Sequence, residues 1–567
     1  MARYRWKIRQ TDDSKVELLT RELSLHPIVA RILVARGYED PETAYKFLKP
    51  SLDDLADPRL LPDASPAVAR LARAIEQRER VLIYGDYDVD GVSSAALWHT
   101  TLSRLGVPVK VKLPHRDREG YDLHPVAIEE AQAFGAKLVL TCDCGTRAHD
   151  VVNALNAHGI EVVITDHHEP DLRLPNAVAV VNPKRFDSQY PYADLSGVGV
   201  SFRLAEALLR ERNIPLRRFR ERMLDLVALG TVADVAPLTG ENRILVREGL
   251  DALYTTRRKG LIALKQVAGI ANRRPTATDI GFRLGPRLNA AGRLDDAIAA
   301  LELLLTEDDA LAEQLASELN RQNAQRQQLE QEAMEEAIRM VQEEEQLRHR
   351  ALVVASPNWH HGIVGLVAGK LRERFGRPTF AISLEEELGR ARGSIRSIPA
   401  MDLVPLLQKM KPLCTKCGGH AIAGGFSARI DQLDALRQLI WEYADSLLTD
   451  EDLIPALEVD AEVSPEEVDW RLYRDLAHLE PFGQGNEVPV LLCRDLTVIS
   501  RRTCRNNKHL FLELKPPERA MYVPAVMWNG AEYAIDPQTS LDVVFSIEWD
   551  DYTGGLRWEL KDFEERL

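Results

Sequence analysis

The chain has 567 residues and should form about three to five domains, because a single hydrophobic core stops growing beyond roughly 250–300 residues. It carries 72 Lys and Arg against 87 Asp and Glu, and this net charge of −15 argues against a protein that coats nucleic acid through bulk positive charge. A nuclease is still compatible with this charge, since metal-holding carboxylates lower the total. No apolar stretch approaches the roughly 20 residues that span a bilayer, no secretory signal is visible, and six cysteines are too few for a disulfide framework. We therefore expect a cytoplasmic protein with reduced thiols and no membrane association.

The first part of the chain predicts a helical lead-in followed by an α/β domain. Residues 1–50 show helical pieces at 22–36 and 41–48. Short apolar strands then alternate with helices: strands are expected at 81–84, 107–113, 138–141 and 162–165, and helices at 67–79, 93–105, 125–134 and 148–157. Continuously apolar strands that alternate with helices indicate a parallel sheet buried on both faces.

The second part predicts a helical connection, another α/β lobe and a β-rich end. Residues 293–356 contain no Gly or Pro and predict one or two long helices, with a strand that starts at Ala351. A second α/β lobe is expected at about 350–450. After Leu453, short β-type runs at 488–492, 510–514 and 543–549 predict a small barrel or sandwich.

Acidic and imidazole side chains directly follow three of the predicted parallel strands. The three strand ends read Gly85-Asp86-Tyr87-Asp88-Val89-Asp90-Gly91, Cys142-Asp143-Cys144-Gly145 and Asp166-His167-His168. The carboxyl ends of parallel strands lie along one edge of a sheet, where open α/β folds bind their ligands. We therefore expect these side chains to converge.

This pattern favours a site for divalent metal ions. Clustered carboxylates repel one another unless a cation neutralises them, and oxygen ligands with one or two imidazoles suit Mg²⁺ or Mn²⁺. Two such ions about 3.5–4 Å apart can activate water and stabilise a phosphoryl transfer. The alternative is structural, because a lone Asp such as Asp86 or Asp166 is usually a cap or turn residue, and a His-His pair alone is more often structural. Three acidic strand ends in register make that alternative improbable.

The ordered motifs resemble those of the DHH phosphoesterases. The matching segments are Asp86-Tyr87-Asp88-Val89-Asp90-Gly91, Asp143-Cys144-Gly145, Asp166-His167-His168 and Gly230-Thr231-Val232-Ala233-Asp234-Val235. Four further segments are similar to the RecJ branch of this superfamily: residues 195–200, 285–294, 418–426 and 481–486. The third is the signature of the associated DHHA1 domain, and the fourth matches the entry to an oligonucleotide-binding (OB) barrel. The resemblance runs from about residue 50 to the end.

The resemblance implies an α/β multidomain fold, in which a parallel-sheet DHH domain and an α/β DHHA1 domain are joined by a long helix and followed by an all-β OB-fold barrel. The expected boundaries are 1–50 for the lead-in, 51–265 for the DHH catalytic domain, 266–348 for the helical connector, 349–450 for the DHHA1 domain and 451–567 for the nucleic-acid-binding barrel.

Carried over residue by residue, the resemblance also assigns roles at the metal site. It makes the following residues ligands of two Mn²⁺ or Mg²⁺ ions, with Asp143 bridging both: Asp88, Asp90, Asp143, His167 and Asp234. His168 would face the scissile phosphate, and Asp86 and Asp166 would orient the ligands. One position departs from the pattern, because Tyr84 stands where many DHH enzymes carry a His. The first metal site is therefore expected to be weaker, more hydrated or preferentially filled by Mn²⁺.

Further residues are candidates for DNA contacts, each with a structural alternative. Arg116 is expected to contact a phosphate rather than form a surface salt bridge. Ser394 and Arg396 are suited to gripping a terminal phosphate. His361 begins a helix and fits either a phosphate site or a helix cap.

Two motif segments add six more candidates. Gly418, Gly419 and His420 would let the nucleic-acid backbone approach closely, or would form a tight turn. Arg287, Asn289 and Arg293 would clamp a DNA backbone or serve the structure; the clamp is favoured for Arg293, and the other two are left open.

The remaining polar and aromatic features are less specific. Cys414 and Cys417 lack the partner ligands of a zinc site and are expected to be ordinary thiols. In the barrel, the basic turn 501–509 and neighbouring aromatic side chains suit a stacking platform for single strands. We expect at least half of the aromatic residues Tyr522, Trp528, Trp549 and Trp558 to be buried.

The function implied by the resemblance is exonucleolytic hydrolysis of single-stranded DNA from the 5′ end by a two-metal mechanism, serving DNA repair and recombination. The implied partners are single-stranded DNA, a single-strand-binding protein and a helicase. The sequence gives no clear oligomer signal, so a monomer is the default expectation. One rival is another DHH activity, on short oligonucleotides or cyclic dinucleotides; enzymes with that activity usually lack a terminal barrel, so residues 455–567 disfavour this rival. The other rival is a catalytically inactive strand-binding scaffold, which predicts broken metal motifs.

Overall fold

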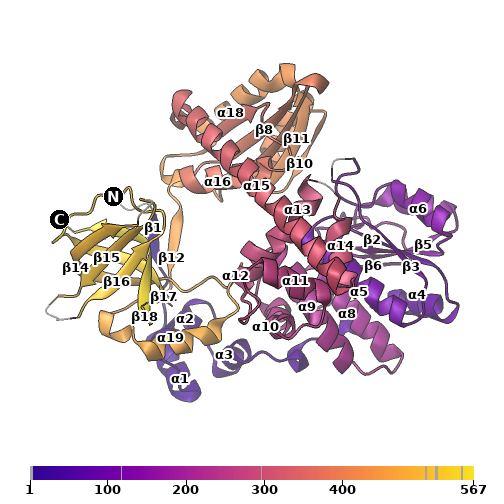
Figure 1. The fold of residues 1–567 in the computed structure, drawn as a ribbon, viewed down its shortest axis with the longest axis horizontal. Coiled ribbons are helices and arrows are strands. Elements are labelled where there is room, and N and C mark those ends of the chain that lie inside the picture. The colour runs from indigo at the N-terminus through magenta and orange to yellow at the C-terminus, as the bar shows by residue number, and fades with distance from the viewer. Residues whose placement is uncertain are drawn as a thin grey trace. The chain divides into compact units, whose positions relative to one another are not determined.

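The computed structural model describes residues 4–116, 118–294, 296–504, 507–517, 521–550 and 553–566 (Figure 1). The chain divides into two compact units. One comprises residues 46–325 and 479–487, and the other comprises residues 1–45, 326–478 and 488–567. The helix α15 (Asp309–Glu343) begins in the first unit and ends in the second.

A five-stranded parallel sheet organises the first unit. Its strand order is β3 (Val109–Lys112), β2 (Val81–Gly85), β4 (Leu138–Cys142), β5 (Glu161–Thr165) and β6 (Ala179–Val181). All neighbouring strands are parallel, and every residue of β2 and β4 is buried. The continuously apolar runs thus form the doubly covered sheet that the sequence predicts.

Helices cover both faces of this sheet. Side chains on one face, such as Ile83, pack against α4 (Ala64–Glu76), α5 (Val89–Arg104) and α8 (Gly197–Glu211). Side chains on the other face, such as Leu82, pack against α6 (Val126–Phe134) and α7 (His149–Ala157). This division follows from the two-residue period of a strand.

The rest of the first unit is helical. The elements are α9 (Arg217–Ala233), α10 (Gly240–Tyr254), α11 (Lys259–Val267), α12 (Ala277–Asp279), the π-helical turn η3 (Ile280–Leu284), α13 (Gly285–Leu294) and α14 (Ile298–Leu305). Helices α5 and α9 pack against each other. Helix α5 begins at the carboxyl edge of the sheet, and α9 ends there, which places the two helices in opposite directions between that edge and the far side of the unit.

The second unit contains a mixed five-stranded sheet. Its order is β10 (Lys416–Gly419), β11 (Ala423–Arg429), β9 (Arg390–Arg396), β8 (Thr379–Glu385) and β7 (Leu352–Ser356). The accompanying helices are α16 (Val364–Phe375), α17 (Leu403–Met410) and α18 (Leu433–Leu447). This is the second α/β lobe expected from the sequence.

The same unit contains a six-stranded β-domain. Its order is β13 (Ala461–Glu462), β14 (Leu491–Thr503), β15 (Leu510–Lys515), β16 (Val523–Met527), β18 (Gly555–Glu565) and β17 (Ser540–Asp550). An additional pairing of β14 with β17 closes the sheet on itself. Closure removes the open edges, as in the small barrel that the sequence predicts.

The lead-in contains a strand that the sequence did not predict. Strand β1 (Arg5–Ile8) pairs in parallel with β12 (Ala456–Val459), and it precedes α1 (Asp13–Leu23), α2 (Pro27–Ala35) and α3 (Pro41–Leu48). The Arg36 guanidinium donates to both carboxylate oxygens of Asp460, at 3.0 and 2.8 Å. The lead-in is therefore attached to the start of the barrel segment.

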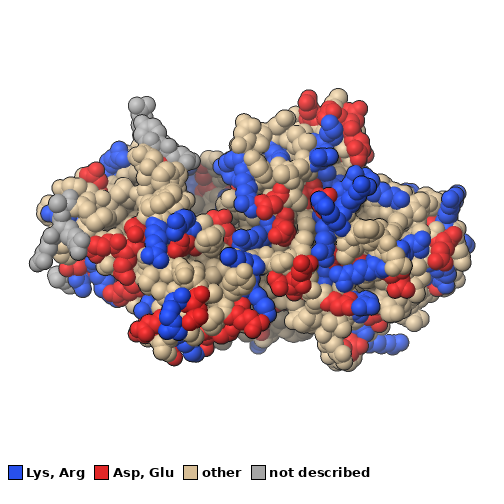
Figure 2. Space-filling view, turned by 90° about the horizontal axis from the view of Figure 1, so that it is seen from below, with Lys and Arg blue, Asp and Glu red and all other residues tan. Residues whose placement is uncertain are grey.

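The surface mixes charges of both signs despite the net charge of −15. Figure 2 shows acidic and basic side chains interspersed over the face that it draws. None of the helices in the described ranges combines the length and apolarity needed to cross a membrane.

Candidate metal centre and nucleic-acid contacts

The predicted acidic motifs begin where three adjacent strands end. Asp86 follows β2, Asp143 follows β4 and Asp166 follows β5. Asp88 caps the start of α5, where its Oδ1 accepts from the backbone N–H of residues 90 and 91. Asp234 lies directly after the last residue of α9. The fold thus brings segments that are far apart in sequence to one edge of the sheet.

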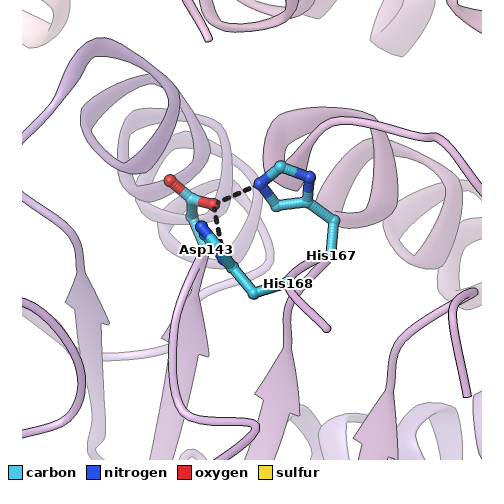
Figure 3. A group of neighbouring side chains, drawn as sticks. All are labelled: Asp143, His167 and His168. Carbon is cyan, nitrogen blue, oxygen red and sulfur yellow. Dashed lines mark ion pairs between the residues drawn. The ribbon is translucent and has the colours of Figure 1, made fainter. Parts of the chain in front are cut away.

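The His167 ring lies close to three of the carboxylates. Its Nε2 atom is 3.0 Å from Asp143 Oδ1, 3.9 Å from Asp90 Oδ2 and 3.8 Å from Asp234 Oδ2. Figure 3 shows the Asp143 carboxylate facing His167 and His168 just beyond the strand ends; His168 Nδ1 is 3.8 Å from Asp143 Oδ1. These separations are within the span of ligands that share a metal ion.

The side chains at this edge form three overlapping sets, and within each set the ligand atoms all lie within 4.8 Å of one another. The sets are Asp86, Asp88 and Asp143; Asp143, His167 and His168; and Asp90, His167 and Asp234. All five residues assigned as ligands from the sequence therefore meet at one centre. Asp143 belongs to two sets, which fits a bridging position between two ions.

Burial and mutual repulsion disfavour ionisation of these carboxyls in the protein alone. Burial, and then the charge of Asp88, raises the pKa of Asp90 to about 7. Burial and the charge of Asp90 raise the pKa values of Asp143 and Asp234. A bound cation reverses this cost, because it stabilises the ionised forms.

The donor set fits a divalent cation. Within the described part of the chain, the buried atoms Asp86 Oδ1, Asp143 Oδ1 and His167 Nε2 have no hydrogen-bond partner. Buried polar atoms are nearly always paired, so three orphans in one cluster indicate a missing ligand. Burial, and then the charge of His168, lowers the pKa of His167 to about 3, which keeps the ring neutral and its lone pair available. Carboxylate oxygens with a neutral imidazole suit Mn²⁺ and Mg²⁺.

His168 is held by a carboxylate and a phenol. Its Nδ1 lies 2.8 Å from Asp166 Oδ1 and 2.7 Å from the Tyr121 hydroxyl. Although burial opposes both shifts, the hydrogen bond between them lowers the pKa of Asp166 and raises that of His168. Asp166 also accepts the backbone N–H groups of residues 146, 167 and 168. It is thus both a turn residue and the group that orients His168.

Tyr121 and two glycines are site residues that sequence reasoning left unassigned. The Gly197 N–H donates to Asp90 Oδ2 at 2.7 Å, and a Cβ on Gly197 would lie 2.6 Å from Asp143 Oδ1. A Cβ on Gly230 would lie 2.6 Å from Asp90 Oδ1. Both glycines therefore permit α8 and α9 to approach the carboxylates closely. Their place inside the quoted motifs was the available signal.

Three predicted DNA-contact residues lie near this edge or support it. Arg116 lies over the Tyr87 ring at 5.4 Å. Burial raises the pKa of Asp86, and the charge of Arg116 opposes that shift. The Asn289 side chain accepts the Val89 N–H at 3.2 Å, and so holds the start of α5. Burial raises the pKa of Tyr87, and the charge of Arg293 opposes that shift.

Arg287 has internal contacts. Its guanidinium donates to Asn320 Oδ1 at 3.0 Å and to the Arg283 carbonyl at 2.6 Å. The DNA contacts of these four residues stay predictions.

The predicted phosphate-binding residues of the second α/β lobe share one face of β9. Ser394 and Arg396 flank the buried Ile395, and a Cβ on Gly365 at the start of α16 would lie 3.1 Å from Ser394 Oγ and 3.5 Å from Arg396 Nη2. Arg392 lies on the same face and was missed, although the alternation of residues 392, 394 and 396 was visible in the sequence. His361 lies 3.7 Å from Glu385, which also pairs with Arg392.

The two glycines of β10 support different interpretations, one a close approach of nucleic acid and the other a tight turn. A Cβ on Gly418 would meet open space, and this residue is in register with Gly425, the partner of Ser394. A Cβ on Gly419 would lie 2.5 Å from the Ala423 carbonyl, so the tight turn explains this glycine. His420 is exposed, and its N–H donates to the same carbonyl.

Tyr84 and the cysteines serve the structure. The Tyr84 hydroxyl accepts the His124 N–H at 3.3 Å within the α6 side of the core. Cys142 and Cys144 are buried in the cores on opposite faces of the sheet. Cys414 and Cys417 belong to none of the metal-binding groups in the described ranges.

The expectation for the barrel aromatics is wrong. Tyr522, Trp528 and Trp549 are exposed, and only Trp558 is buried, where it stacks on Phe545. The three exposed residues lie at or beyond strand ends, whereas Trp558 lies within β18. In the basic turn, residues 505 and 506 lie outside the described ranges, and Arg502 lies over the Phe511 ring at 5.1 Å.

Three family models match the chain. The DHH family N-terminal domain matches residues 80–231, the DHHA1 domain matches residues 349–446 and the RecJ OB domain matches residues 459–561. These segments correspond to the parallel sheet, the mixed sheet and the barrel described above.

Curated relatives and solved structures agree with this division. The single-stranded-DNA-specific exonuclease RecJ of Bacillus subtilis is 38% identical over 507 residues, which are 89% of this chain and 64% of that protein. The exonuclease of the same name from Dickeya dadantii is 37% identical over 484 residues, 82% of this chain and 83% of that one. The crystal structure of Thermus thermophilus RecJ with Mn²⁺ has a TM-score of 0.86 and 30% identity, and it covers all of this chain and 80% of that one. The Mg²⁺ complex of the same protein has a TM-score of 0.80 at 29% identity, with coverage of 100% and 79%.

Proposed function

The chain belongs to the RecJ family of DHH phosphoesterases, and we propose that it is a metal-dependent exonuclease specific for single-stranded DNA. The observation that carries the proposal is the convergence of carboxylates and a neutral imidazole at one sheet edge, with buried oxygen and nitrogen atoms left unpaired. Such a donor set serves two divalent ions in phosphodiester hydrolysis.

The five residues named above as ligands would hold two Mn²⁺ or Mg²⁺ ions. When bound, the ions would lower the pKa of a water and neutralise charge on the scissile phosphate. Although burial opposes the shift, the hydrogen bond from Asp166 raises the pKa of His168, and Asp166 fixes the ring through Nδ1. The ring can then donate from Nε2 to a phosphate oxygen as charge develops there. Burial of Asp90 and Asp143 excludes bulk water from the ligands.

The DNA strand would be recognised by the mixed-sheet domain and by the barrel. The face of β9 that presents Arg392, Ser394 and Arg396 is suited to a terminal phosphate, because guanidinium and hydroxyl groups grip phosphate oxygens directly. Attack from the 5′ end is proposed from the family resemblance. The exposed Trp528 and Trp549 suit stacking with unpaired bases.

The cellular setting is proposed from the family alone. We place the activity in DNA repair and recombination in the cytoplasm, with a single-strand-binding protein and a helicase as partners and the monomer as the working form. Because Tyr84, unlike a His, contributes no ligand from β2, the first metal site is proposed to be weaker or more hydrated, with Mn²⁺ or Mg²⁺ as the ion.

Digestion of a long single strand labelled at its 3′ end tests the function. The account expects stepwise shortening from the 5′ end and release of mononucleotides, with no digestion of the matching duplex. Cleavage of dinucleotides alone would favour the other DHH activities, and strand binding without turnover would favour a scaffold. Asp143→Ala is the matched inactive control.

A further inference from the structure

A polar cavity lies in the first unit, at the far ends of the helices that hold the metal ligands. Its volume is about 650 Å³. It is lined by the last turn of α5, the first turns of α9, the connection between α10 and α11, and the residues that follow α14. Helix α5 has 16 residues, so at about 1.5 Å per residue the cavity is about 24 Å from Asp88. One mononucleotide is too short to reach both places.

Basic side chains dominate the lining. The six cations are Arg104, Arg218, Arg222, Arg257, Arg258 and Lys259. Only three acidic residues accompany them, and two of these already have partners. Asp225 pairs with Arg258 at 3.2 Å, and Glu221 pairs at 2.9 Å with Arg217, which lies outside the lining.

Four guanidiniums of the lining lack a protein counter-ion. In the part of the chain that the structure describes, no hydrogen bond or ion pair engages the side chains of Arg104, Arg218, Arg222 and Arg257. They come from three separate segments and are exposed to solvent. Like charges that line one cavity repel one another, and a bound anion would remove that repulsion.

The size and the remaining lining restrict the type of anion. Cavities of about 300–1,000 Å³ hold small ligands, so 650 Å³ suits a nucleotide better than an extended strand. Arginine grips phosphate oxygens in pairs of parallel hydrogen bonds. Thr100, Thr255 and the half-buried Leu305 line the same space and suit a sugar and a base.

We propose that this cavity is a binding site for a small phosphate-rich anion, of which a nucleoside diphosphate is the representative. The site is separate from the metal centre and independent of the exonuclease proposal, because none of its lining residues is a metal ligand. The phosphates would lie among the four unpaired guanidiniums.

Calorimetric titration of the whole chain with ADP, with inorganic pyrophosphate and with a short single-stranded oligonucleotide, each with and without Mn²⁺, tests the site. The expected result is binding that weakens on the order of tenfold in Arg218→Ala and again in Arg222→Ala, since a hydrogen bond to a charged group is lost each time. Arg217→Ala is the matched control, because it removes the same charge one residue away from the lining. Thermal unfolding of each variant checks that it folds.

The arms separate the sources of affinity. Tighter binding of ADP than of pyrophosphate supports contacts with the nucleoside, and equal binding supports recognition of phosphate alone. Three results would overturn the proposal: no binding of either anion, equal losses in Arg217→Ala and Arg218→Ala, or binding of a short oligonucleotide but not ADP with the same arginine dependence.

Discussion

The two ends of the helix pair α5 and α9 differ in the sign of the charge that they carry. At the sheet edge the helices present Asp88, Asp90 and Asp234, which crowd negative charge around a buried imidazole. At the other end they present Arg104, Arg218 and Arg222, which crowd positive charge around an open cavity. One pair of packed helices thus separates a cation site from a proposed anion site. In both places, unbalanced like charge marks where a ligand belongs.

The largest effect is expected for Asp143→Asn. This change removes the proposed bridging carboxylate, and hydrolysis should fall at least about 10³-fold, since losing even one charge-stabilising group costs roughly 10²–10³. It also removes a buried carboxyl whose ionisation is disfavoured by its neighbours, so the metal-free protein should become about 1–2 kcal/mol more stable. Strand digestion and thermal unfolding measure the two effects. Full activity, or a loss of stability in the metal-free variant, would contradict the account.

The pH dependence of stability should differ with and without metal. The pKa of Asp90 in the folded protein is about 7, above the ordinary value of 3.8. The contribution of Asp90 to the free energy of unfolding is therefore full below about pH 4 and is lost as pH rises through 7. The metal-free protein should lose on the order of 4 kcal/mol over this range. Mn²⁺ should restore the stability most strongly at the alkaline end, because metal and protons compete.

Denaturant unfolding between pH 4 and 8, with and without Mn²⁺, measures this difference. Asp90→Asn is the control, and its metal-free profile should be flatter. The same profile in the variant and the unchanged protein would mean that Asp90 is not the titrating group.

The independence of the two ends is testable with one variant. Arg218→Ala with Arg222→Ala should leave the stabilisation by Mn²⁺ unchanged, because neither residue approaches the metal ligands, while ADP binding falls on the order of 100-fold. Thermal shifts with Mn²⁺ and with ADP measure both. An altered stabilisation by Mn²⁺ would show that the arginines and the metal ligands are electrostatically coupled, which would contradict their independence.

A small effect is expected just after Asp234. Val235 adopts a φ of +61° and is exposed, although a β-branched side chain is strained in this region. Val235→Gly should therefore stabilise the protein by up to about 1 kcal/mol, as measured by the midpoint of denaturant unfolding. A lower midpoint would show that contacts of the valine outweigh the backbone strain.

The metal centre was largely predictable, whereas several contacts around it were not. Asp86, Asp143 and Asp166 each follow a contiguous apolar strand, so the topology of a parallel sheet suffices to bring them together. Tyr121 reaches His168 from a loop, and nothing in its local sequence specifies that contact.

Long-range pairing explains the other differences. Strand β1 finds its partner β12 at the other end of the chain, and four residues carry too little pattern to reveal it. The aromatic residues of the barrel were misjudged because burial depends on position along a strand: Trp528 and Trp549 lie at strand ends, and Trp558 lies in the middle. The arginine-lined cavity has no motif, because its segments meet only in the folded unit.

The most direct measurement is anomalous diffraction from crystals of the Mn²⁺-loaded protein. The account predicts two peaks roughly 3.5–4 Å apart, both bound by Asp143 and together bound by Asp88, Asp90, His167 and Asp234. Manganese bound elsewhere, or peaks that Asp143 does not touch, would contradict it.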